Sequence, residues 1–140
     1  MKCKIEKDNI SNLCNKIGNI YMFVSEAGYD LKDFSDKYLL NVLPNSLENI
    51  NKYNCLEDYL NYIIENLDIK LNEDIKCISS ECAFFIGYIY YFLYLITGDS
   101  GEILKKKLPF DYMLIKSYGL VTEDREKAAK EICEILNCPI

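Results

Sequence analysis

The chain contains no histidine and no tryptophan, and a single arginine, Arg125, stands among its 16 basic residues. Histidine is the side chain that ordinarily titrates near neutral pH, so its absence removes the commonest general acid or base. The acidic pairs Glu57–Asp58 and Glu123–Asp124 are adjacent in sequence, point to different sides of a helix and suit its first turn. An enzyme would need a polar cleft, and the sequence offers no set of residues to line one. We therefore predict a protein that is not an enzyme, with no catalytic residue and no cofactor.

The sequence also lacks any C-x-x-C or histidine-containing zinc motif, although it has seven cysteines. Cys77 and Cys82 are five residues apart, as are Cys133 and Cys138, and on a helix this offset is about 140° around the axis, which is poor for gripping one metal ion. The first residues are too charged for a secretory signal. We predict a cytoplasmic protein without a metal site, in which all thiols are reduced and most are buried. The cysteines are Cys3, Cys14, Cys55, Cys77, Cys82, Cys133 and Cys138.

Basic charge is scarce, and the formal net charge is −6. A general nucleic-acid-binding surface needs basic charge to displace counterions, so this class of protein is disfavoured. The only basic run, Lys105–Lys107, suits the end of a short helix. Half of the 140 residues are hydrophobic, which fits one globular domain over residues 1–140. Lysine makes up 15 of the 16 basic residues, and asparagine and isoleucine are abundant, as they are in proteins of AT-rich genomes such as those of low-GC bacteria or their phages.

The most prominent feature that is present is an uncharged run of 17 residues, Cys82–Gly98, which includes four tyrosines. A membrane-spanning helix needs about 20 apolar residues and usually has basic flanking residues. This run is shorter, and its nearest flanking charges are those of Glu81 and Asp99. We therefore predict a buried central helix over about residues 80–97 rather than a membrane span. A glycine inside a helix costs about 1 kcal/mol relative to alanine, so Gly87 predicts a close crossing by a neighbouring helix.

Apolar residues recur at spacings of three and four along nearly the whole chain, which is the pattern of amphipathic helices. Candidate helix starts are marked by Asp8, Asp30 and Asn54, and by Asp99 with Glu102 three residues later. Between the helices, a connector precedes the central helix and is either helical or extended. We predict an all-α fold, a compact bundle of about seven or eight helices around a central aromatic-rich helix. The predicted helices span about residues 8–27, 30–41, 46–53, 54–67, 80–97, 99–108, 109–118 and 122–136, and the connector spans residues 68–79.

Tyrosines surround the predicted central helix on all sides, at Tyr88, Tyr90, Tyr91 and Tyr94. A bundle core is expected to take most of them, because a helix that is apolar all round lies in the middle of a bundle. Tyrosine is also enriched at the centre of protein–protein contacts, so one face remains a candidate for binding a partner. The following segment, Gly98–Gly101, lacks the Lys-Ser/Thr of a phosphate-binding loop and is predicted to be a helix-to-helix turn.

The second half of the chain carries a pattern of aromatic and glycine residues in five short segments. They are Ala83–Tyr90, Thr97–Ser100, Met113–Leu114, Tyr118–Gly119 and Thr122. Together they resemble a family of small bacterial helical proteins, over about residues 83–130. Members of that family look like companions of an ADP-ribosyltransferase-like toxin in short operons. The resemblance implies an antitoxin-like protein whose partner is a toxin of that kind.

This chain departs from the family's pattern at its polar positions. The family's Arg is Tyr91 here, its Trp is Leu93, its His is Val121, and the turn at Ser100 is one residue shorter. The glycines and apolar positions remain. The resemblance therefore supports the fold but transfers no polar contact and no catalytic residue.

These observations predict a protein-binding, antitoxin-like or toxin-associated accessory protein that neutralises or regulates a partner enzyme by direct contact. The alternative is a phage-type acidic inhibitor of a nucleic-acid-binding complex, whose carboxylates mimic phosphates. Carboxylates along one face at phosphate-like spacing favour the alternative, whereas carboxylates that pair with lysine or cap helices count against it. Neither function involves direct contact with nucleic acid or a membrane. The predicted partner-binding residues are the exposed members of Tyr88, Tyr91 and Tyr94, with Asp99, Ser100 and Glu102 in the adjoining turn.

Overall fold

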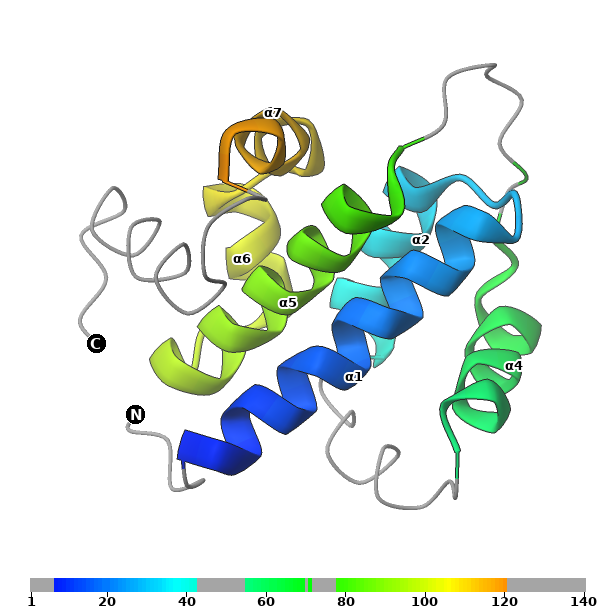
Figure 1. Ribbon diagram of the computed structural model, residues 1–140, viewed down its shortest axis with the longest axis horizontal. Coiled ribbons are helices and arrows are strands. Elements are labelled where there is room, and N and C mark those ends of the chain that lie inside the picture. The colour runs from blue at the N-terminus through cyan, green and yellow to red at the C-terminus, as the bar shows by residue number, and fades with distance from the viewer. Residues whose placement is uncertain (1–6, 43–54, 70, 72–77, 121–140) are drawn as a thin grey trace.

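The computed structural model describes residues 7–42, 55–69, 71 and 78–120, and these residues are mostly helical (Figure 1). Within these ranges the chain forms six α-helices and a π-helical segment and no β-strand, so the prediction of an all-α fold is confirmed. The predicted helices at 46–53 and 122–136 lie outside the described residues, and the total of seven or eight helices stays a prediction. The elements are α1 Lys7–Glu26, α2 Leu31–Lys37, η1 Tyr38–Val42, α4 Leu56–Leu67, α5 Ser80–Thr97, α6 Gly101–Lys107 and α7 Phe110–Leu120.

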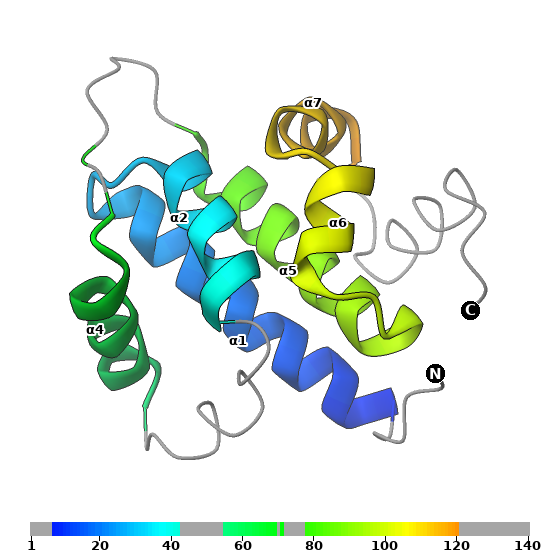
Figure 2. The same ribbon diagram turned by 180° about the vertical axis from the view of Figure 1, so that it is seen from behind.

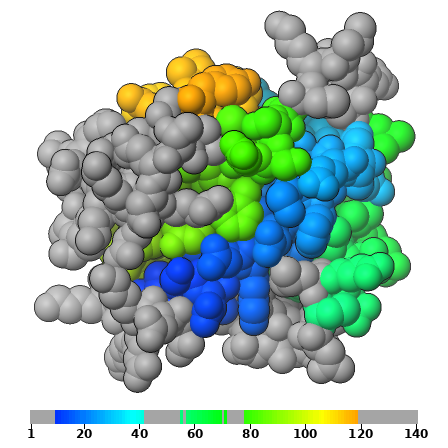
Figure 3. Space-filling model, viewed as in Figure 1, coloured from blue at the N-terminus to red at the C-terminus, as the bar shows by residue number. Residues whose placement is uncertain are grey.

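The two longest helices, α1 and α5, lie side by side and form the most extensive contact between elements (Figures 1 and 3). The side of α1 that faces inward is the one predicted from the apolar spacing. Helix α1 begins at Lys7, so the prediction of Asp8 as its N-cap is wrong, because Asp8 already lies in the first turn. Gly28 follows the end of α1 with φ +92°, a left-handed conformation that suits glycine and confirms the predicted stop. The buried residues of α1 are Ile10, Cys14, Ile17, Ile20, Tyr21 and Val24.

Gly87 of α5 lies close against α1. A Cβ atom at this position would lie 2.7 Å from the ring of Tyr21 and 2.9 Å from the carbonyl oxygen of Ile17. Both distances are shorter than a real Cβ contact, so only glycine lets the two backbones come this near. The predicted close crossing at Gly87 is therefore confirmed.

Helix α5 packs on α1 along one side and on α6 and α7 along another (Figure 2). It spans Ser80–Thr97, close to the predicted range of about 80–97, with Ser79 as N-cap and Gly98 as C-cap. Twelve of its 18 residues are buried, which explains why its sequence is apolar all round. Among the described residues, α5 is the one helix long and apolar enough to span a membrane, and 67% of it is buried inside the protein. One or two such helices are weak evidence for a membrane protein, because the core helix of a folded domain has the same length and composition.

Helix α2 begins at the predicted cap, Asp30, whose carboxylate accepts hydrogen bonds from the backbone N–H groups of Lys32 (3.0 Å) and Asp33 (3.3 Å). Its apolar residues then pack against α1. The ring of Phe34 lies edge-on to that of Tyr21, with centroids 5.2 Å apart. Offset and edge-on ring pairs of this kind add about 0.5–1.5 kcal/mol to the gain from burial. At Tyr38 the helix widens into the π-helical segment η1.

Helix α4 lies at the edge of the molecule, on the other side of α1 from α6 and α7 (Figures 1 and 2). Its predicted capping residue was Asn54, which lies outside the described residues. The structure has Cys55 in the N-cap position, without a side-chain hydrogen bond, so α4 starts one residue later than predicted. Tyr59 and Ile63 are the side chains of α4 that are fully buried.

The segment before α5 was predicted to be a connector. Its described part is not helical: Leu71 forms an isolated antiparallel bridge with Tyr29, and Ile69 is buried. The carbonyl of Ile78 accepts a hydrogen bond of 3.3 Å from the hydroxyl of Ser25, which ties the end of the connector to α1. The rest of the segment, residues 70 and 72–77, lies outside the described residues.

Helices α6 and α7 follow α5 through short turns. Pro109 precedes α7, and its carbonyl accepts the hydrogen bond from the N–H of Met113 (3.1 Å). The helix predicted over residues 109–118 corresponds to α7, which ends two residues later, at Leu120. Tyr118 of α7 is 63% exposed, whereas Met113 is fully buried.

Candidate functional site

The predicted partner-binding tyrosines are the first element of the candidate site. The structure buries two of them: Tyr88 is 4% exposed and Tyr91 is fully buried. Tyr94 alone of the three is partly exposed. Tyr88 and Tyr91 are therefore corrected to core residues, and Tyr94 is the predicted tyrosine that a partner can reach.

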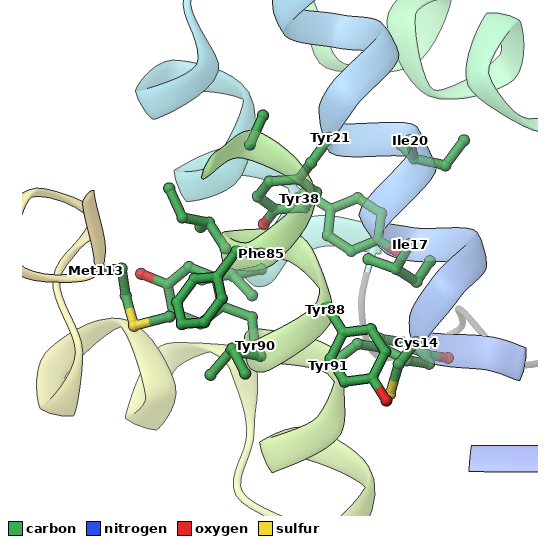
Figure 4. Packing of buried hydrophobic residues seen from close by; sticks show 14 of the residues in the cluster. Cys14, Ile17, Ile20, Tyr21, Tyr38, Phe85, Tyr88, Tyr90, Tyr91 and Met113 are labelled. Atoms are coloured by element: carbon green, nitrogen blue, oxygen red, sulfur yellow. The ribbon is translucent and has the colours of Figure 1, made fainter. Parts of the chain in front are cut away.

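The burial of Tyr88 and Tyr91 follows from their place on α5. Both rings lie on the side of α5 that faces α1 (Figure 4), where the glycine contact at Gly87 brings the helices close together. The ring of Tyr94 packs against that of Tyr91, with centroids 5.6 Å apart. One edge of Tyr94 thus belongs to the core while another reaches solvent, as is typical of tyrosines at the rim of a helical core.

The turn between α5 and α6 is held by its own polar side chains. The hydroxyl of Thr97 donates to the carbonyl of Leu93 (2.7 Å) and accepts from the N–H of Asp99 (3.1 Å). The carboxylate of Asp99 accepts a hydrogen bond of 3.1 Å from the ammonium group of Lys107. The predicted helix-to-helix turn is confirmed, but Asp99 has a different role from the predicted helix cap.

The cap of α6 is Ser100. Its hydroxyl oxygen accepts a hydrogen bond of 3.3 Å from the N–H of Ile103. Glu102, predicted to complete a capping box with Asp99, instead lies 3.8 Å from the ammonium group of Lys106, one helical turn further on. The predicted box of Asp99 and Glu102 is wrong because the helix starts one residue later than the pattern indicated.

Gly101 holds this turn against the rest of the fold. The sequence predicted Gly101 only as part of a turn and gave no sign of this contact. A Cβ atom at Gly101 would overlap with the carbonyl oxygen of Leu39 in η1. The backbones of α6 and η1 therefore meet at a glycine, as those of α1 and α5 do at Gly87. Next to this contact, Leu40 of η1 and Ile103 of α6 are exposed apolar side chains.

The lysines of the run Lys105–Lys107 lie in the last turn of α6, as predicted. Lys106 and Lys107 pair with Glu102 and Asp99, as described above. Ion pairs at exposed positions contribute about 0–1 kcal/mol each, so these pairs orient side chains more than they stabilise the fold.

A second group of charges joins α2 to α6 and α7. Lys32 donates a hydrogen bond of 3.0 Å to the carboxylate of Asp111, which raises the pKa of Lys32. Burial raises the pKa of Asp36, and the positive charges of Lys105 and Lys32 offset only part of this effect. Asp33 pairs with Lys37 at 3.0 Å, one turn further along α2.

Buried tyrosine hydroxyls find partners inside the fold. Tyr21 shares a hydrogen bond of 2.8 Å with Ser35, Tyr38 shares one of 3.3 Å with Tyr59, and Tyr90 donates to the carbonyl of Leu108. Burial raises the pKa of Tyr21, Tyr38 and Tyr90, so these three phenols stay protonated at neutral pH. These hydrogen bonds satisfy the buried hydroxyl groups, because a buried hydroxyl without a partner would cost about 1–3 kcal/mol of stability.

Three cysteines lie within the described residues: Cys14 and Cys82 are buried, and Cys55 is exposed. Cys3, Cys77, Cys133 and Cys138 lie outside the described residues. No group of three cysteine, aspartate or glutamate side chains in the described ranges is arranged to hold a metal ion.

Comparison with family models, curated proteins and solved structures gives no match to this chain. The resemblance over residues 83–130 to companions of ADP-ribosyltransferase-like toxins therefore stays a prediction. Of the predicted partner-binding residues, Tyr94, Asp99, Ser100 and Glu102 are at least partly exposed, and these four residues are hereafter called the α5–α6 turn surface.

Proposed function

We propose that this chain is a protein-binding, antitoxin-like or toxin-associated accessory protein, without enzymatic activity, that neutralises or regulates a partner enzyme by direct contact. The proposal takes α5 as the centre of a bundle of seven or eight helices. Its partner would be an ADP-ribosyltransferase-like toxin, as the family resemblance implies. Contact would occur in the cytoplasm and would involve neither a membrane nor direct binding of nucleic acid.

One observation carries the choice of surface: the α5–α6 turn surface is at least partly exposed, and its conformation is held by contacts within the fold. Ser100 caps α6, the carboxylate of Asp99 is fixed by Lys107, and Gly101 lies against the backbone of η1. A surface whose conformation is already fixed loses little entropy on binding, which favours affinity. Tyr94 supplies an aromatic side chain of the kind enriched at interface centres, and Ile103, whose N–H bonds to Ser100, is an exposed apolar side chain of α6.

The test starts from the partner. Affinity purification from the native host identifies it, and the purified partner's transferase activity is then measured with increasing amounts of this protein. We expect inhibition that is complete at a fixed molar ratio. Undiminished activity of the partner with excess protein, or turnover of a small molecule by this protein alone, would overturn the proposal.

Two variants locate the contact. Tyr94→Ala removes the exposed part of an aromatic contact and is expected to weaken binding by about 2 kcal/mol, roughly 30-fold. Glu102→Lys reverses a charge on an exposed helical turn and is expected mainly to slow association and to change its salt dependence. The matched control is Glu65→Lys, an equal change of charge on the exposed face of α4 at the other edge of the molecule. Equal binding by all three variants and the unmodified protein would show that the contact lies elsewhere.

The alternative, an acidic inhibitor that mimics phosphates, has weaker support. Several carboxylates in the described part of the chain have local roles: Asp30 caps α2, Asp33 pairs with Lys37, and Asp99 pairs with Lys107. One feature favours the alternative, because α4 contains three exposed acidic residues and no basic one. These residues are Glu57, Asp58 and Glu65. Displacement of DNA from a basic protein by this chain, lost in Glu57→Lys and Glu65→Lys, would support the alternative over the proposal.

A further inference from the structure

We draw no further inference here: the strongest candidate, the outer face of α7 on which Ile115 and Tyr118 are exposed, carries no proposal because nothing in the structure shows what covers it.

Discussion

Gly87 of α5 lies directly against the ring of Tyr21 of α1. A Cβ atom at residue 87 would be 2.7 Å from two carbons of that ring, which is fully buried and also contacts Phe34 of α2. Tyr21 has little room to move, because its hydroxyl shares a hydrogen bond with Ser35 and its ring also contacts Phe34. The pairing of a glycine with a fixed aromatic ring sets the distance between the two longest helices.

Replacing this glycine is expected to destabilise the fold. Gly87→Leu should lower the free energy of unfolding by about 1–3 kcal/mol, because the added side chain overpacks the contact between α1 and α5. Urea denaturation measures the change. A matched pair of alanine variants, Gly87→Ala and Gly18→Ala, tests the cause. At Gly18 the added Cβ meets only the partly exposed ring of Phe84, at 2.9 Å, so we expect a smaller loss of stability in Gly18→Ala than in Gly87→Ala. An equal or larger loss in Gly18→Ala would contradict overpacking at Gly87 as the cause.

Truncation of Tyr91, which is buried, should cost more stability than truncation of Tyr94, which is partly exposed. Tyr91→Ala removes a fully buried ring and is expected to cost about 3–5 kcal/mol of stability, the range for large aromatic truncations in cores. Tyr94→Ala should cost clearly less, because its ring is only partly buried. Thermal unfolding of both variants checks this order. Equal melting temperatures would mean that Tyr91 is not the core residue described here.

The start of α6 provides a test of which residue caps the helix. Ser100→Ala removes the hydroxyl that accepts from Ile103 and is expected to lower stability by about 1 kcal/mol. Ser100→Asp should restore most of this loss, because aspartate is an equally good N-cap. Asp99→Ala breaks an ion pair near the surface and is expected to cost less than Ser100→Ala. If denaturant titrations show a larger loss of stability in Asp99→Ala than in Ser100→Ala, Asp99 rather than Ser100 is the helix cap.

Replacing Asp36 by asparagine is expected to stabilise the protein at neutral pH but not at acidic pH. Burial raises its pKa in the folded state above the ordinary value of 3.8, so the protonated form favours folding and ionisation opposes it as the pH rises through this range. Asp36→Asn should therefore be more stable than the unmodified protein at pH 7. The difference should vanish below about pH 3.8, where the unfolded chain is also protonated.

The neighbouring carboxylate supplies the control for this prediction. Asp33 pairs with Lys37 at 3.0 Å, so Asp33→Asn should not stabilise the protein at pH 7. Urea titrations of both variants between pH 3 and 7 separate a specific effect of Asp36 from a general relief of negative charge. If both variants gain stability equally, the net charge rather than burial is responsible.

Helix caps show where local sequence is sufficient and where it is not. Asp30 was correctly predicted because it is the only good capping residue at the start of α2. At the start of α6, Asp99 and Ser100 are adjacent and both are good caps, so the local pattern does not decide between them. The choice depends on Lys107, which binds Asp99 from the far end of α6, and on Gly101, which must meet the backbone of Leu39. Both are tertiary contacts.

The sequence by itself determined the helical class, the extent of α5 and the close contact at Gly87. These follow from periodicity, from an uncharged run of helical length, and from the cost of glycine within a helix. The exposure of each tyrosine on α5 was decided only by the tertiary structure. A helix that is apolar all round carries no periodic signal to show which side faces solvent, so the packing of α1 decided that Tyr88 and Tyr91 are buried and that Tyr94 reaches the surface.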